Sequence, residues 1–474
     1  MRAIPITVAA LLVLFASTCA PAGSSASTPQ DPALAETSPR VRLRLSGQLE
    51  GYLEPCGCAA NQLGGLARRA FKLGEDRDYD LLIEGGNTIA TNTDLDVDKL
   101  MEILQVLDDS DRRYDALGVG PKDLELLDDS FLYLLDGREL TAVASDVVPK
   151  ELEGLDWPLR RYYERTVGSI KVRVASLVVT APEGYEILPP QRAWQESMEG
   201  AAPSTLRILL AHTTMDGVRS LAKLSPKPDL LVAINGAHPH PPDEPTIVDG
   251  VPLVHPGTRG RHLVDVTLTR MNGVPKITHY HAIPLTGSRT AKGAMEDPNV
   301  VQSLIQHRFQ VKEAGLRESM ANHLPTPTPG ATYVGSEICG DCHESAYEVW
   351  QNSRHGHAWT TLEEAEGGTK YPWPITHYPD CVQCHVVGYQ QKSGFINPEK
   401  TPDLKHVGCE ECHGPGSIHV DAASPSAKDF VPQTIDVCLR CHTYEQTPTF
   451  TKEYDKYWKK IEHFLDKKDE ENPK

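Results

Sequence analysis

Four copies of one short pattern dominate the last third of this sequence. In each copy two cysteines are separated by two residues, and a histidine follows the second cysteine directly. The copies are Cys339-Gly-Asp-Cys342-His343, Cys381-Val-Gln-Cys384-His385, Cys409-Glu-Glu-Cys412-His413 and Cys438-Leu-Arg-Cys441-His442. Two thiols three positions apart can reach both vinyl groups of one porphyrin, and the adjoining imidazole then lies over its iron. The spacing predicts four covalently attached c-type haems, whose proximal iron ligands are His343, His385, His413 and His442.

Structural zinc is the main alternative, because zinc sites also use paired cysteines. A zinc site has no need for a histidine directly after every second cysteine, so the repeated pattern favours haem. Large aliphatic residues are sparse after Ala331, and haem macrocycles would supply the missing apolar volume. Three of the 11 cysteines remain outside the motifs: Cys19, Cys56 and Cys58.

The sixth iron ligand is expected to be histidine as well. The last methionine is Met320, so methionine ligation would require the preceding part of the chain to reach across. His413 is held to one face of its own haem, and the turn that follows lets His419 reach a neighbouring haem. Six histidines follow Ala331 outside the motifs: His355, His357, His377, His406, His419 and His463.

Further short sequence patterns accompany the four cysteine motifs. They are Tyr333-Val-Gly, Trp350-x-x-Ser353-x-His355, Cys409-Glu-x-Cys412-His413-Gly-Pro-Gly-Ser-x-His419 and a terminal helix that contains His463. With these patterns the region resembles the tetrahaem cytochromes that accept electrons from hydroxylamine oxidation. The resemblance implies touching haem pairs and distal ligation by His355 and His419. It also implies that one haem can lack a strong sixth ligand.

The remaining distal ligands stay open. We expect His377 and His463 to complete the candidate set, while His357 and His406 are alternatives. For His463 the two arguments disagree. On a helix over Lys452–Lys468 it faces away from the apolar stripe, and hence toward solvent, whereas the resemblance makes it a ligand.

The preceding part of the chain alternates strand-like and helix-like segments, which predicts an α/β sandwich over residues 40–290. Prolines between Pro325 and Gly330 forbid helix and predict, with the helix-like stretch Asn299–Met320, a linker over 291–330. A mostly helical or irregular multihaem cytochrome c domain is expected over 331–474. The predicted strands are Val41–Leu45, Leu81–Glu84, Leu140–Ala144, Val172–Val179, Leu206–Leu210, Leu230–Ile234 and Leu263–Leu268.

Several segments of the sandwich carry landmarks: Gly64-Gly-Leu-Ala-Arg68, Leu82-Ile-Glu-Gly-Gly-Asn87, Tyr114-Asp-Ala-Leu-Gly-Val-Gly120, Ala211-His212, Ala237-His-Pro-His240 and His255-Pro-Gly-Thr. They resemble the 5'-nucleotidase branch of the calcineurin-like metallophosphoesterases, which hold two metals for hydrolysis. Here Asn87, Pro121 and Lys122 stand where that family places metal ligands. The resemblance therefore implies a scaffold or binding role rather than hydrolysis.

Some candidate metal ligands survive. Asn87, His212, His238 and His240 would suffice for one divalent metal. Cys56-Gly-Cys58 lies where the first family ligands would be, and its alternatives are a small disulfide, buried thiols, or a soft-metal or redox role. These six residues form the predicted second site.

The N-terminus has the layout of a secretory signal peptide over residues 1–26, with a basic residue, an apolar run and small residues. Cleavage before Cys19 would make a lipoprotein, which is the only membrane attachment expected. The net charge of −18 argues against nucleic acid and favours basic protein partners. We therefore expect an exported, periplasmic or cell-envelope carrier between a redox donor and acceptor. The alternatives are a multihaem reductase acting at an open haem and a phosphohydrolase with an altered metal site.

Overall fold

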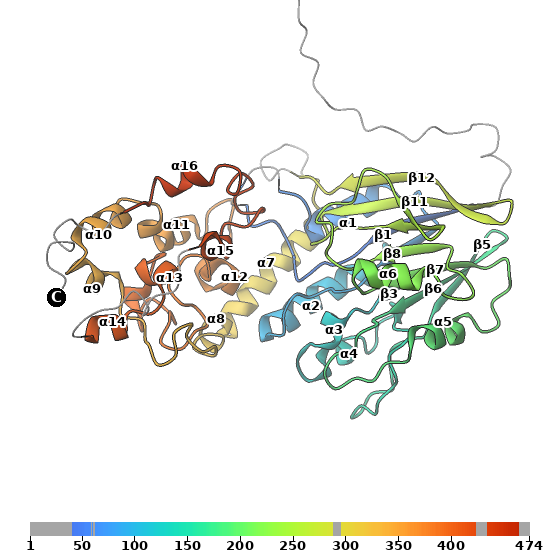
Figure 1. The fold of residues 1–474 in the computed structure, drawn as a ribbon, viewed down its shortest axis with the longest axis horizontal. Helices are drawn as coiled ribbons and strands as arrows, with labels where there is room; N and C mark the ends of the chain where they lie inside the picture. The colour runs from blue at the N-terminus through green and yellow to red at the C-terminus, as the bar shows by residue number, and fades with distance from the viewer. Residues whose placement is uncertain (1–39, 58, 60–61, 288–294, 423–433, 464–474) are drawn as a thin grey trace, which may run out of the picture.

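The computed structural model describes residues 40–57, 59, 62–287, 295–422 and 434–463. The predicted signal peptide, Cys19 and Cys58 lie outside these residues. The described chain forms a β-rich part and a helical C-terminal part, with helix α7 (Pro298–Glu313) lying between them (Figure 1). No helix in the described ranges is both long enough and apolar enough to cross a membrane.

Two mixed six-stranded sheets make up the β-rich part, in the orders β12-β11-β1-β2-β3-β4 and β5-β6-β7-β8-β10-β9. Each contains four neighbouring parallel strands, and antiparallel strands complete it. The strands are β1 (Arg40–Ser46), β2 (Leu81–Glu84), β3 (Ala116–Gly118), β4 (Ala142–Val143), β5 (Tyr163–Val167), β6 (Ile170–Leu177), β7 (Leu206–Ala211), β8 (Leu230–Ala233), β9 (Thr246–Val248), β10 (Val251–Val254), β11 (His262–Met271) and β12 (Val274–Pro284).

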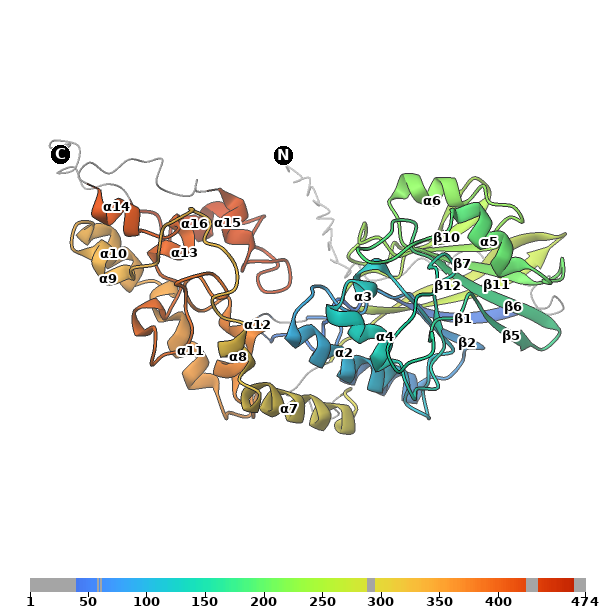
Figure 2. The ribbon, with the colours of Figure 1, turned by 90° about the horizontal axis from the view of Figure 1, so that it is seen from below.

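Apolar side chains explain this layered arrangement. Strands β2, β7 and β8 are nearly continuous aliphatic runs, as expected for strands buried on both faces, whereas β1 and β6 alternate aliphatic with polar residues. One core cluster fills the space between the sheets, and two others join their outer faces to helices. Figure 2 shows α5 and α6 on one side of the sandwich and α2 to α4 on the other. The predicted α/β sandwich is confirmed.

The helices are mostly short, and those described after α7 have at most eight residues. They are α1 (Leu66–Glu75), α2 (Asp94–Leu107), α3 (Pro121–Leu124), α4 (Ser130–Leu134), α5 (Pro190–Met198), α6 (Met215–Leu221), α7, α8 (Leu316–Ser319), α9 (Ser336–Gly340), α10 (Glu344–Gln351), α11 (Ala358–Ala365), α12 (Pro379–Val382), α13 (Cys409–His413), α14 (Ser417–Asp421), α15 (Ile435–Leu439) and α16 (Tyr454–Trp458). Four 3₁₀ turns cover Leu127–Asp129, His355–His357, Ile375–His377 and Pro402–Leu404.

Two predicted helices differ from the structure. The stretch Asn299–Met320 is broken after α7, because Gly315 adopts a left-handed backbone with φ 67° and begins a separate helix. The terminal helix expected over Lys452–Lys468 covers only Tyr454–Trp458 among the described residues, and turns follow it up to Ile461. Helical periodicity therefore does not apply at His463.

The two parts of the molecule share one apolar cluster. Leu95 of α2 and Val311 of α7 pack in the same cluster as Trp359, Tyr378 and Val382 of the C-terminal part. Lys99 of α2, whose side chain is 9% exposed, forms an ion pair of 2.7 Å with Asp380 of α12. The second cysteine motif therefore lies directly against the helices of the sandwich.

Candidate haem sites

Each cysteine motif starts on a short helix. The first cysteines belong to α9, α12, α13 and α15, and one helical turn puts residues three apart on the same face. The backbone of the first and last motifs closes this turn, since His343 and His442 donate their N–H groups to Cys339 and Cys438. None of the eight motif cysteines is paired in a disulfide. The two thiols of each motif are thus arranged to bond one porphyrin.

The motifs adjoin in two pairs. The neighbouring Cys409 thiol raises the pKa of Cys339, and the neighbouring Cys384 thiol raises the pKa of Cys441. The first motif therefore lies beside the third, and the second beside the fourth. Haems attached at these motifs would form two neighbouring pairs.

Three imidazole pairs join a motif histidine to a histidine from elsewhere. The ring centres are 6.2 Å apart for His343 and His419, 6.0 Å for His442 and His355, and 5.9 Å for His413 and His463. Metal–imidazole bonds of about 2.0–2.1 Å put two ring centres roughly 6 Å apart with the metal between them. The residues present therefore fit an iron held from both faces.

The surroundings of these rings also suit haem. Burial lowers the pKa of His355, His413 and His442, so each ring is neutral near pH 7 and keeps a lone pair for a metal. Around the first pair, Ile338, Ile418 and Val420 are 43%, 39% and 49% exposed. A porphyrin between His343 and His419 would cover apolar surface of this kind.

His385 of the second motif differs from the other three motif histidines. Its Nδ1 donates to the Ala358 carbonyl at 2.5 Å, which leaves Nε2 to face an iron. No second imidazole ring pairs with His385 in the part of the chain that the structure describes. The candidate His377 lies against the Thr376 hydroxyl at 3.1 Å, and His406 accepts a hydrogen bond from the Trp359 backbone at 3.3 Å.

Glu410, inside the third motif, organises the chain around the first imidazole pair. Its carboxylate is 3% exposed and accepts hydrogen bonds from three backbone N–H groups, those of Val334, Gly335 and Gly416, at 2.8 to 3.1 Å. These bonds join the segment before the first motif to the turn that leads to His419. Sequence analysis missed this role, although Glu410 was part of the family pattern.

In the sandwich, two predicted metal ligands approach each other. A Cβ atom on Gly120 would lie 2.1 Å from Asn87 Oδ1 and 2.8 Å from His212 Nδ1, so both side chains converge on this glycine. Burial lowers the pKa of His212 to about 3. Asp123 is fully buried and accepts hydrogen bonds from the backbones of Asn87, Thr88 and Gly120, so it holds the loops together.

The other predicted ligands of this second site lie apart from that pair. His238 packs edge-on against His255 at 4.4 Å between ring centres, and His240 against His262 at 5.3 Å. Lys122 points to solvent and pairs with Glu125 at 3.1 Å. Among residues 40–57, 59, 62–287, 295–422 and 434–463, no three His, Cys, Asp or Glu side chains are grouped to hold a metal.

The segment that contains Cys56 packs on the haem region. Cys56 is in a disulfide, which involves none of the eight motif cysteines. Tyr371 donates its hydroxyl hydrogen to the Cys56 carbonyl at 2.6 Å, and Lys370 donates to the Gly57 carbonyl at 2.5 Å. The Cys56 segment therefore belongs to the contact between the two parts of the molecule.

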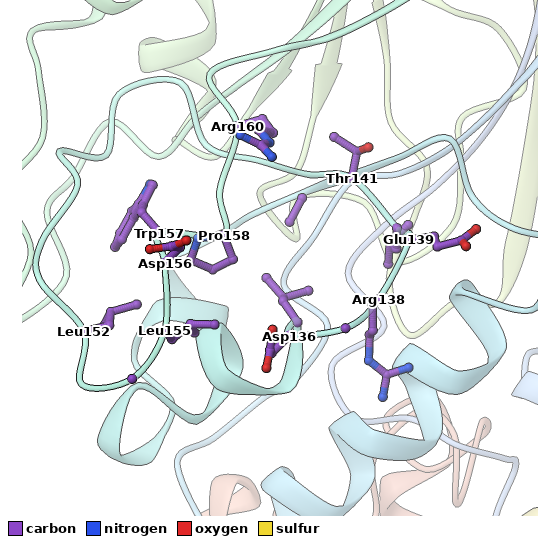
Figure 3. Close-up of a pocket in the computed structure, with 15 residues that line it drawn as sticks. Asp136, Arg138, Glu139, Thr141, Leu152, Leu155, Asp156, Trp157, Pro158 and Arg160 are labelled. Carbon is purple, nitrogen blue, oxygen red and sulfur yellow. The ribbon is translucent and has the colours of Figure 1, made fainter.

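Two cavities accompany these sites. One of about 410 Å³ is lined by Tyr333, Cys412 and Arg440 and lies beside the third motif. Another, of about 740 Å³, lies between the loops 135–142 and 152–160 of the sandwich. In Figure 3 its Arg138 side chain points away from Asp156 and Trp157, so the polar groups do not converge on a ligand position.

Comparisons with known proteins agree with these two parts. The family described as cytochrome c554 and c-prime matches residues 338–414. Cytochrome c-554 of Nitrosomonas europaea is 37% identical over 94 residues, which are 18% of this chain and 40% of that protein. The C-terminal region is therefore a cytochrome c554 domain, which implies covalent c-type haem. The chain spans well under two thirds of this relative's length.

The sandwich is similar to solved nucleotidase structures. NAD nucleotidase (NadN) of Haemophilus influenzae matches with a TM-score of 0.50 and 13% identity, covering 66% of this chain and 69% of that one. A 5'-nucleotidase precursor of Thermus thermophilus matches with a TM-score of 0.48 and 16% identity, over 66% of this chain and 67% of that one. At 13% identity the likeness to NadN concerns the fold alone, and it agrees with the predicted metallophosphoesterase-like α/β sandwich.

Proposed function

We propose that this chain is an exported electron carrier that passes electrons through four covalently bound haems. The observation that carries the proposal is the set of three imidazole pairs with ring centres about 6 Å apart, each joining a motif histidine to a distant one. A haem iron held between two imidazoles accepts and releases one electron without exchanging ligands. The protein fixes the rings, and the two adjoining motif pairs keep neighbouring haems close.

The sandwich serves in this proposal as a scaffold without hydrolytic activity. Lys122 lies where the related enzymes need a metal ligand, and its ammonium group would repel a cation. The net charge of −18 supports redox partners with basic docking surfaces, because long-range attraction speeds the encounter of opposite charges. Export through residues 1–26 and lipid attachment at Cys19 stay predictions from the sequence.

A second candidate function is reduction of a small molecule at the second motif. It is favoured by His385, whose ring has no imidazole partner among the described residues. A haem with one free axial position can bind a small ligand such as carbon monoxide, whereas a haem with two strong ligands cannot.

Intact mass and electron paramagnetic resonance test these proposals together. We expect four haems, three of them low-spin and one high-spin. His419→Ala should convert one more haem to high-spin, because it removes the ring facing His343, and the haem count should stay at four. His323→Ala, which removes an exposed imidazole that precedes the haem region, is the matched control and should leave the spectrum unchanged. Fewer than four haems, or an unchanged low-spin signal in folded His419→Ala, would contradict the proposal. Four low-spin haems in the wild type would contradict the second candidate.

A further inference from the structure

A short loop follows the fourth motif and enters the sandwich. Glu445 lies three residues after His442, and its side chain is only 7% exposed. Arg261 Nε donates to Glu445 Oε1 at 2.9 Å, and the guanidinium groups of Arg259 and Arg261 both form ion pairs with this carboxylate. A carboxylate of the haem region is thus neutralised by two arginines of the sandwich.

Both arginines are held in place by their own part of the molecule. Arg261 also donates to the Pro239 carbonyl and the Thr258 hydroxyl at 3.1 and 3.0 Å. Arg259 has a left-handed backbone with φ 55°, which residues other than glycine rarely adopt, and it donates its N–H to the Gln48 carbonyl. Arg259 also pairs with Glu50 at 3.5 Å, so the sandwich presents two preplaced guanidinium groups, one of them shared with a second carboxylate, to Glu445.

The same loop also fixes the proximal histidine of the fourth motif. The His442 Nδ1 lies 3.0 Å from the Thr447 hydroxyl, and the backbone N–H groups of Glu445 and Thr447 both donate to Thr443. Gln62 of the sandwich adds a hydrogen bond of 2.9 Å to the Glu445 carbonyl. The orientation of His442 and the charge near it thus depend on one five-residue segment.

We propose that Arg259 and Arg261 of the sandwich, acting through Glu445, set the reduction potential of the haem attached at Cys438 and Cys441. This inference rests on the proposed haem at that motif. A negative charge near the iron favours the ferric state, and a positive charge favours the ferrous state. Arg259 and Arg261 are positioning residues here, and the sandwich becomes an electrostatic part of the electron chain.

The expected effect follows from the short separation. Three residues span at most about 11 Å, so the Glu445 carboxylate lies on the order of 10 Å from an iron bound by His442. One unit charge at roughly 10 Å and an effective dielectric of about 20 changes the ferric-to-ferrous ratio on the order of tenfold. For a one-electron couple a tenfold change corresponds to about 59 mV. Because this carboxylate is buried, salt screens it less than it screens a surface charge.

A spectroscopic redox titration of the full chain tests the inference. Glu445→Gln should raise one of the four midpoint potentials by about 59 mV, which corresponds to the tenfold change in the ferric-to-ferrous ratio. Arg261→Gln should lower the same midpoint by a smaller amount, because the arginine is farther from the iron. Arg261→Lys keeps the charge and should remain near the wild type. As a matched control, Glu453→Gln removes an exposed carboxylate of the same region and should shift each midpoint much less.

The direction of the shifts distinguishes an electrostatic effect of these residues from a loosening of the protein around the haem. If the variants only admitted water around the haem, both would favour the ferric state and lower the potential. Unchanged midpoints, or a fall in both variants, would therefore overturn the inference while the haem count stays at four. A wild-type protein whose Cys438 and Cys441 carry no haem would instead overturn the proposed function.

Discussion

Replacing Glu410 with glutamine should destabilise the cytochrome c554 domain and disturb one haem. The ionised carboxylate accepts from the N–H groups of Val334, Gly335 and Gly416, whereas glutamine keeps one acceptor oxygen and turns an NH₂ group toward the other donors. A buried N–H without an acceptor costs about 1–3 kcal/mol, and bonds to a neutral acceptor are about half as strong as those to a carboxylate. The loss should reach about 2–5 kcal/mol, a large share of the roughly 5–15 kcal/mol that stabilises a domain.

The assay is unfolding in guanidinium chloride, followed by the haem absorption band and by far-UV circular dichroism. Glu337→Gln is the matched control, because Glu337 is an exposed carboxylate on helix α9 close to the same motif. The Glu410 variant should also gain high-spin signal, since Gly416 begins the turn that positions His419. A Glu410→Gln protein that unfolds within about 0.5 kcal/mol of the control would refute the role assigned to this carboxylate.

Two further predictions concern the sandwich and its contact with the haem region. Burial, with Arg308 and Lys99 nearby, lowers the pKa of His307 to about 3, below the roughly 6.5 of an unfolded chain. The unfolded chain therefore binds this proton first, so stability is full above pH 6.5 and falls toward pH 3 by at most about 1.4 kcal/mol per unit. In urea titrations over this pH range, His307→Gln should lose less stability than the wild type. The control His323→Gln, which replaces an exposed histidine, should lose as much stability as the wild type. Nucleotide hydrolysis with added manganese or zinc should stay far below that of working metallophosphoesterases, because Asn87 and Lys122 replace metal ligands; comparable turnover would show the alignment to be wrong.

The sequence was most informative where chemistry is local. Haem attachment depends on residues within one helical turn, so the four motifs could be read directly. Strands such as β7 and β8 were predicted because burial on both faces demands continuous aliphatic runs. Strand β12 was missed, since its residues alternate between exposed and half-buried positions and form no apolar run. The three-residue strand β3 is too short to show a period, although its segment was part of the landmark Tyr114–Gly120.

Long-range relations could not be derived in this way. The pairing of His355 with His442 depends on how distant turns pack, and no local pattern specifies it. His463 illustrates the point, because helical periodicity directed it to solvent while the helix in fact ends at Trp458. The clamp of Arg259 and Arg261 on Glu445 joins residues far apart in sequence, and an isolated acid after a motif gave no signal for it. The cytochrome resemblance supplied His355, whereas spacing alone favoured only His419 among the six histidines.

The apolar cluster that contains Leu95, Val311 and Tyr378 determines where this protein can be truncated without exposing its interior. The prolines before Gly330 would be a natural boundary for a truncated protein. A fragment that ends there would nevertheless expose Leu95 and Val311, which pack in this cluster. A fragment that begins there would lose the aliphatic side chains that pack against Tyr378 and Val382 at its second motif. The two parts thus have a common interior, and a substitution at Val311 of α7 would affect the packing of both.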